Sequence, residues 1–323
     1  MKEWAEPRLP ESPRIAAMGR ERKDHLDTLA VLLLLACCAV WGLGQVAAKM
    51  TLVEIPPLLQ AALRSLGATG LLLAWCRWRG AEVWSSLWRA DGTGAAGLLA
   101  GLLFAGEFAC IFVGLQYTSA SRMVVFIYLA PFVVALGMPF ITRSEGLGGL
   151  QMLGLLAAFA GVVWAFYEGF MSPLAGPRQW LGDALGIGGA LLWGLTTLVL
   201  RASRLGNAPA EKALLYQLSV SALVLGLMSV SAGEVWPARL TGASLWPLAF
   251  QMLVVTFGSY LVWFWLVRHY PATRVSAFTL LTPVFGLLAG VGLLGEPLTW
   301  RLVLALAAVC AGIALVNRAP RRR

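Results

Sequence analysis

From Leu26 onward, long apolar runs alternate with short polar segments. Each run approaches the 20 or so apolar residues that an α-helix needs to cross a lipid bilayer. The pattern predicts an all-α polytopic membrane protein with ten transmembrane helices joined by short loops. The predicted ranges are 27–48, 57–76, 95–115, 120–141, 147–167, 181–201, 210–231, 244–268, 272–294 and 299–317.

Polar segments divide the predicted helices into two units. Residues 1–25 are rich in Pro, Glu and Arg and are predicted to form a disordered tail. The following apolar run is too long for a signal peptide and lacks an A-x-A cleavage pattern. We expect helices one to five in residues 26–168, a Gly/Pro linker in 169–180, helices six to ten in 181–317, and a basic tail in 318–323.

The composition supports a membrane protein. Of the 323 residues, 59% are apolar and 13% are charged, about half the charged share of an average soluble domain. Soluble, disordered and disulfide-scaffold classes are therefore excluded. The five cysteines lie in or beside apolar runs without a CxxC or a nearby His, so we expect buried thiols and neither disulfides nor a metal site. They are Cys37, Cys38, Cys76, Cys110 and Cys310.

The net charge of +9 comes from short basic clusters between the apolar runs and at the two ends. This distribution disfavours nucleic-acid binding, which needs a basic face. The two tails and the even-to-odd loops carry 19 of the 25 Lys and Arg residues, against 5 in the remaining loops. The positive-inside rule therefore predicts that both termini lie in the cytoplasm and that the chain resides in the inner (plasma) membrane.

An internal repeat appears at an offset of 152 residues. Residue types that are rare in apolar sequence recur at this offset: Trp41/Trp193, Pro57/Pro209, Phe112/Phe264, Arg122/Arg274 and Pro131/Pro283. Because each copy has an odd number of helices, the second copy must enter the bilayer inverted. Inverted repeats related by a two-fold axis in the membrane plane are typical of secondary transporters, with the substrate site between the copies. A duplicated bundle without a transport role is the alternative.

Several short motifs resemble a known family. They are Ala39-Val40-Trp41-Gly42, Pro56-Pro57, Ala61-Ala62-Leu63-Arg64, Leu115-Gln116-Tyr117-Thr118-Ser119-Ala120, Pro131 and Gly295-Glu296-Pro297-Leu298. Together they resemble EamA-type repeats of the drug/metabolite transporter superfamily over residues 27–317. The aromatic-rich helices also resemble the YddG-type aromatic amino-acid exporters. Ser144-Glu145-Gly146 and Tyr216 depart from the pattern. The resemblance implies ten helices, inverted topology and export of small metabolites.

Charged residues inside spans are costly and are candidates for function. Glu107 lies within the third helix, and its repeat mate is Ser259. Its carboxyl group could couple proton movement to transport, bind a substrate ammonium group, or serve only as a structural hydrogen-bonding group. For Arg64 we favour a structural or gating ion pair over binding of a substrate carboxylate. Glu145 and Glu296 lie at span ends, where they could cap helix five or ten.

Aromatic residues predict the walls of a cavity. Trp41 and Gln45 share one face of the first helix, as Trp193 and Thr197 do on the sixth. Two such faces would form an apolar pocket with a few hydrogen-bonding groups, as small-molecule sites require. An interfacial Trp belt is the alternative. Further candidates for the cavity wall are Phe126, Tyr128, Tyr260, Trp263 and Phe278.

Pro131 and Pro283 occupy equivalent positions within the fourth and ninth helices. Each lacks a backbone donor and can kink its helix. We interpret these kinks as hinges that open or shape the cavity, with passive packing bends as the alternative.

The predicted function is export of small metabolites by alternating access. The metabolites that we expect are amino acids, including aromatic or apolar ones. The expected partners are a small-molecule substrate, the lipid bilayer and a proton as candidate coupling ion, with no cofactor. Efflux of drugs or other metabolites is the alternative within transport. A membrane-embedded enzyme is the rival class, but the sequence has no H-E-x-x-H, G-x-S-x-G or P-loop motif. Its two histidines, His25 and His269, lie at loop edges.

Overall fold

A computed structural model describes residues 23, 25–114, 116–118, 120–165, 167, 178–237, 239–294 and 300–317. Every regular element in these residues is helical. The predicted basic tail, Glu296 and nearly all of the predicted N-terminal tail and linker lie outside the described residues.

The described residues of the first half form seven α-helices and one short 3₁₀ turn. These elements are α1 (Thr28–Thr51), α2 (Pro57–Arg79), α3 (Ala81–Trp88), α4 (Gly94–Gly114), α5 (Ala120–Ile127), α6 (Ala130–Ile141), η1 (Arg143–Glu145) and α7 (Gly149–Ala165). The short helix α3 was not predicted. Its apolar residues, Val83, Trp84, Leu87 and Trp88, recur at helical spacing within a segment too short to span a bilayer.

The second half repeats the order of long helices. Its elements are α9 (Gln179–Ala202), η2 (Arg204–Asn207), α10 (Ala210–Ser231), α11 (Gly242–Phe250), the π-helix η3 (Gln251–Ser259), α12 (Tyr260–His269), α13 (Ala272–Phe278), η4 (Thr279–Leu281), α14 (Thr282–Leu294) and α15 (Trp300–Val316). Each of the ten predicted ranges contains helix. Seven segments of the described chain are long and apolar enough to cross a membrane, and 149–164 and 306–316 are shorter apolar helices.

Two of the predicted helices are interrupted at equivalent places. Where one helix was predicted over 120–141, α5 ends at Ile127 and α6 begins at Ala130. Where one was predicted over 272–294, the 3₁₀ turn η4 separates α13 from α14. Pro131 and Pro283 each follow the interruption, in the first turn of α6 and α14. Proline is tolerated there because the first turn of a helix leaves its backbone N–H groups without intrahelical partners.

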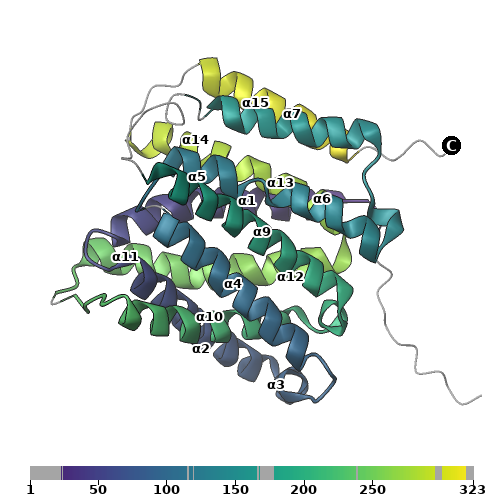
Figure 1. Ribbon diagram of the computed structural model, residues 1–323. Helices are drawn as coiled ribbons and strands as arrows, with labels where there is room; N and C mark the ends of the chain where they lie inside the picture. The colour runs from purple at the N-terminus through teal and green to yellow at the C-terminus, as the bar shows by residue number, and fades with distance from the viewer. Residues whose placement is uncertain are drawn as a thin grey trace, which may run out of the picture.

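The packing of the helices has two-fold pseudosymmetry. Helix α1 packs against α11 and α14, and its counterpart α9 packs against α4 and α6, the counterparts of α11 and α14. Equivalent helices pair directly in α2 with α10 and in α7 with α15. Figure 1 shows these two pairs at opposite edges of the bundle, with α1, α4, α9 and α12 between them. Such exchanged contacts are what a two-fold axis between inverted repeats produces.

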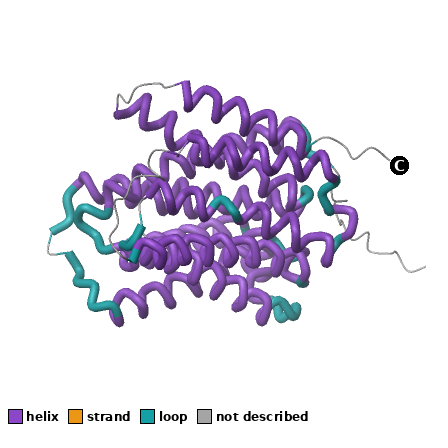
Figure 2. The backbone as a smooth tube through the Cα atoms, turned by 45° about the horizontal axis from the view of Figure 1, so that its top comes forward, coloured by secondary structure: helices purple, strands orange, loops and turns teal. Residues whose placement is uncertain are grey.

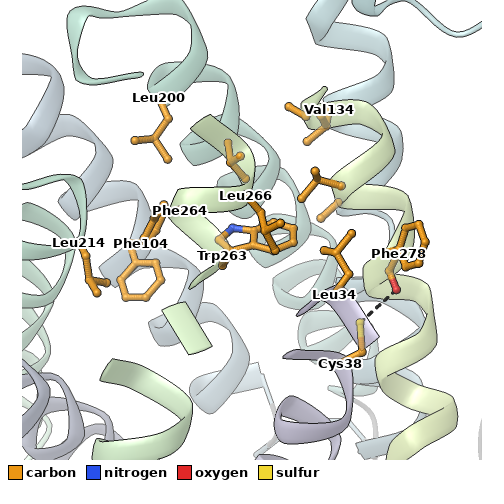
Figure 3. Packing of buried hydrophobic residues seen from close by; sticks show 14 of the residues in the cluster. Leu34, Cys38, Phe104, Val134, Leu200, Leu214, Trp263, Phe264, Leu266 and Phe278 are labelled. Carbon is orange, nitrogen blue, oxygen red and sulfur yellow. Dashed lines mark hydrogen bonds between the residues drawn. The ribbon is translucent and has the colours of Figure 1, made fainter. Parts of the chain in front are cut away.

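The buried core lies between the two halves. Figure 3 shows side chains of α1, α4, α6, α9 and α12 converging there, with the Cys38 thiol donating a hydrogen bond of 3.2 Å to the Phe278 carbonyl oxygen. Figure 2 shows that helices make up most of the described backbone, with short loops between them. Large apolar side chains also cover the outer surface, among them Phe140, Leu223 and Trp246. An apolar surface of this kind marks contact with lipid.

Candidate functional site

Two ionisable side chains, one basic and one acidic, lie in the core within electrostatic range of each other. Arg64 of α2 is 6% exposed and Glu107 of α4 is 7% exposed. Within the described part of the chain, Arg64 Nε and Nη2 and Glu107 Oε2 make no hydrogen bond. Burying a charge without hydrogen-bonding partners costs several kcal/mol. The arrangement is therefore expensive for a purely structural pair.

An aromatic wall adjoins the charged pair. The Arg64 guanidinium carbon lies 3.9 Å from the centroid of the Phe108 ring, a close cation–π contact. Phe108 packs edge-on against Phe104 at 4.9 Å, and Phe104 packs against Tyr260 of α12 at 5.8 Å. Tyr260 also lies within electrostatic range of Arg64 and Glu107. The site therefore contains residues of both halves.

Trp41 extends this wall on the opposite side of Tyr260. Its ring centroid lies 6.1 Å from that of Tyr260 and 5.2 Å from that of Trp263. The indole Nε1 donates a hydrogen bond of 2.7 Å to Ser259 Oγ, which itself donates to the Val255 carbonyl at 2.5 Å. Ser259 is the last residue of the π-helix, a form of helix found often at functional sites. The hydrogen bond fixes the orientation of the indole ring.

The second tryptophan of the repeat approaches the same region from α9. Trp193 lies 5.8 Å from Tyr128, which is buried in the interruption between α5 and α6. Tyr128 is within electrostatic range of Tyr260 and Glu107. The Thr197 hydroxyl donates back to the Trp193 carbonyl at 3.4 Å, so this polar group is used within its own helix. Gln45 lies in α1, but its side chain is outside the described residues.

Two other predicted cavity residues, Phe126 and Phe278, have neighbours of their own. Phe126 lies over Gly186 of α9, with the Arg122 guanidinium 5.9 Å from its ring. Phe278 borders a separate groove of about 290 Å³ between α1, η4 and α15. The other residues lining this groove are His25, Leu26, Val31, Leu35, Leu281, Cys310, Ile313, Ala314 and Asn317.

Ion pairs lie at the two ends of α9. Near its start, Asp183 receives hydrogen bonds from Arg122 Nε at 3.0 Å and Nη2 at 2.5 Å, and from the Thr118 hydroxyl at 2.7 Å. Near its end, Arg201 forms a buried ion pair with Glu145. Both pairs join the two halves of the chain. The sequence pointed to neither Asp183 nor Arg201, since acids and bases at span ends are common.

Glu145 caps a helix, although not helix five or ten. Its Oε2 accepts a hydrogen bond of 2.7 Å from the backbone N–H of Ala272, at the start of α13 in the other half. Its backbone oxygen accepts from the Thr273 hydroxyl at 3.1 Å. Arg201 in turn donates to the Val267 carbonyl at 3.1 Å. This cluster ties the α6–α7 connection to α9, α12 and α13.

Two further carboxylates outside the spans hold chain segments together. Asp27 accepts hydrogen bonds from Lys23, from the Ala30 backbone N–H and from the Tyr270 hydroxyl, and chiefly the Lys23 bond lowers its pKa to about 2. Asp91 accepts from the Thr93 hydroxyl at 2.6 Å and from Lys212 at 2.9 Å. These two bonds, led by that of Thr93, lower the pKa of Asp91.

A duplicated helical bundle with buried ionisable and aromatic residues between its halves is the architecture found in membrane transporters of the inverted-repeat class. The family model described as "EamA-like transporter family" matches residues 28–167 and again residues 180–318. The chain therefore belongs to the EamA-like transporter family, as its motifs predicted.

Bacterial proteins of similar length are related to this chain in sequence. "Uncharacterized transporter YvbV" of Bacillus subtilis is 28% identical over 304 residues, which cover 91% of this chain and 93% of that protein. "Uncharacterized protein PA1977" of Pseudomonas aeruginosa is 32% identical over 236 residues, covering 72% and 75%. One crystal structure superposes with a TM-score of 0.76 at 18% identity, over 90% of this chain and 97% of that one. The family and the name of the Bacillus subtilis relative indicate a membrane transporter.

Proposed function

We propose that the protein is a secondary transporter of the plasma membrane that exports amino acids, including aromatic and apolar ones, by alternating access. The observation that carries this proposal is the buried pair Arg64 and Glu107 beside aromatic rings of both halves. Small-molecule sites combine apolar walls with a few convergent polar groups. Charges of both signs next to Phe104 and Tyr260 suit a solute that carries both charges and an apolar side chain.

The two ion pairs of α9 support alternating access. Asp183 and Arg201 lie 18 residues apart on this helix, about 27 Å at the rise of an α-helix, so they close opposite ends of the bundle. The interruption between α5 and α6 lies between them and lets each end move separately. With both termini in the cytoplasm, the Glu145–Arg201 pair would close the cytoplasmic end and the Arg122–Asp183 pair the opposite end. A proton on Glu107 is the candidate coupling ion.

Counterflow in proteoliposomes tests the proposal. The purified protein is reconstituted, vesicles are loaded with unlabelled phenylalanine or leucine, and uptake of the labelled amino acid is followed against protein-free vesicles. We expect a transient overshoot with both amino acids. Absence of counterflow for amino acids, with counterflow of hydrophobic amines instead, would contradict amino-acid export and support drug efflux. Chemical conversion of the solute would instead indicate an enzyme.

A further inference from the structure

We infer that Arg64 and Glu107 together bind the two charged groups of an amino-acid zwitterion, Arg64 the α-carboxylate and Glu107 the α-ammonium group. This inference rests on the proposed function and assigns the atoms of its site. It also gives Arg64 the substrate-binding role that the sequence ranked below a structural ion pair.

The unused donors of Arg64 have the geometry that a carboxylate requires. Nε–H and Nη2–H lie along one edge of the guanidinium plane and can bind both oxygens of a carboxylate. On Arg64 these two nitrogens have no hydrogen-bond partner among the described residues, although the side chain is more than nine-tenths buried. Phe108 covers one face of the guanidinium group, and the Tyr260 hydroxyl interacts with the same group.

Elsewhere in this protein, the same edge of another guanidinium group binds a carboxylate. Arg122 binds the carboxylate of Asp183 through Nε and Nη2, the same two nitrogens that Arg64 leaves unused. A substrate carboxylate at Arg64 would therefore repeat an arrangement that the fold already contains. The desolvation cost of the unpaired donors would be offset in the bound state, which favours binding of the carboxylate over its uncharged analogues.

Glu107 supplies the complementary charge. Its Oε2 is buried without a hydrogen-bond donor in the described residues, and an ammonium group has three donors to offer. Arg64 and Glu107 lie within electrostatic range of each other, so the two charges of one small zwitterion can face both residues. Because the repeat mates of these residues are Tyr216 and Ser259, the second half cannot build an equivalent charged pair. The zwitterion site therefore belongs to the first half of the chain, without a counterpart at the equivalent positions of the second.

The aromatic wall then receives the side chain of the substrate. Phe104, Tyr260 and Trp41 form a continuous series of edge contacts that begins beside the charged pair. An aromatic ring of the substrate that meets these rings edge-on or offset would be favoured beyond simple burial, and an aliphatic side chain would be favoured by burial alone. Zwitterions with an apolar side chain fit this combination, whereas those with a charged side chain would have to bury a third charge.

Competition against labelled phenylalanine counterflow tests the assignment. The competitors are phenylalanine, its amide, which lacks the carboxylate, and N-acetylphenylalanine, which lacks the ammonium group. We expect phenylalanine to compete at least about tenfold better than either analogue, because a missing partner leaves a buried charge unpaired. This comparison uses the unaltered protein and does not depend on the folding of any variant.

Variants then assign each charge. R64Q should weaken phenylalanine about tenfold or more while leaving the amide unchanged, and R64K should recover only part of the loss because it lacks the planar fork. E107Q should remove the preference over N-acetylphenylalanine. R77Q, at an exposed position of the same helix α2, is the matched control and should behave as the unaltered protein.

The outcomes separate the two proposals. If the unaltered protein shows no amino-acid counterflow, the proposed function fails. If counterflow occurs but the amide competes as well as phenylalanine, or R64Q weakens all three compounds equally, the zwitterion assignment is overturned and amino-acid export stands.

Discussion

Removing one charge of the Glu145–Arg201 pair should destabilise the closed end of the bundle strongly. The side chains are 9% and 1% exposed, respectively, so neither charge can be rehydrated without moving the helices. Breaking a buried ion pair by removing one partner costs about 3–5 kcal/mol, because the remaining charge stays buried. At about 1.4 kcal/mol per factor of ten, this corresponds to at least a hundredfold shift of the equilibrium between folded and unfolded protein.

A double-mutant cycle isolates this interaction. E145Q keeps an oxygen that can accept from the Ala272 backbone N–H, so it removes the charge and retains the cap. R201Q removes the opposite charge, and the double variant leaves no unpaired charge. We expect each single variant to lower the free energy of unfolding by about 3 kcal/mol or more, and the double variant to cost about 1–3 kcal/mol less than the sum of the two. Equilibrium unfolding of the purified protein in mixed micelles measures all three.

The matched control is K23Q, which breaks the exposed Lys23–Asp27 pair, and its stability should change little. If E145Q and R201Q cost no more than this control, or if their effects simply add, the pair does not hold the halves together. The closure assigned to this end of the bundle would then be wrong.

Two further predictions concern the interruption in the fourth span and a tie between loops. P131A restores a backbone donor and favours a continuous helix across Tyr128, so counterflow should slow while the amount of protein in the membrane stays constant; a normal rate would contradict a hinge. D91N should lower the Tm, because Lys212 is 1% exposed and would lose a negatively charged partner while keeping neutral acceptors such as the Arg89 carbonyl at 2.8 Å. Since the pKa of Asp91 is lowered, its carboxylate stabilises the fold above the usual Asp value of about 4 and loses this effect as the pH falls through the lowered pKa. The Tm difference between D91N and the unaltered protein should therefore be constant from pH 7 to about pH 4 and shrink at lower pH, and a difference that persists in strong acid would contradict this account.

The amino-acid sequence alone established the class, the helices and the duplication. Only helices satisfy all backbone hydrogen bonds within one apolar segment, so the length of each run was sufficient to predict a span. Rare residues such as Trp41 and Trp193 marked the repeat because they do not recur by chance at one offset. The motifs that these residues belong to were sufficient for the family, which the match of both halves confirmed.

The tertiary structure decided which side chains meet. Most spans are apolar all round, so helical periodicity does not mark the face that turns inward, and packing between helices makes that choice. Helix packing places Arg64 over the Phe108 ring and within electrostatic range of Glu107. It places Phe278 at a groove between α1, η4 and α15. Glu145 pairs with Arg201, which lies far along the chain in the other half. No local sequence pattern predicts a contact of that kind. Local sequence determines elements because their hydrogen bonds are local, whereas a site between two repeats exists only after the repeats have packed together.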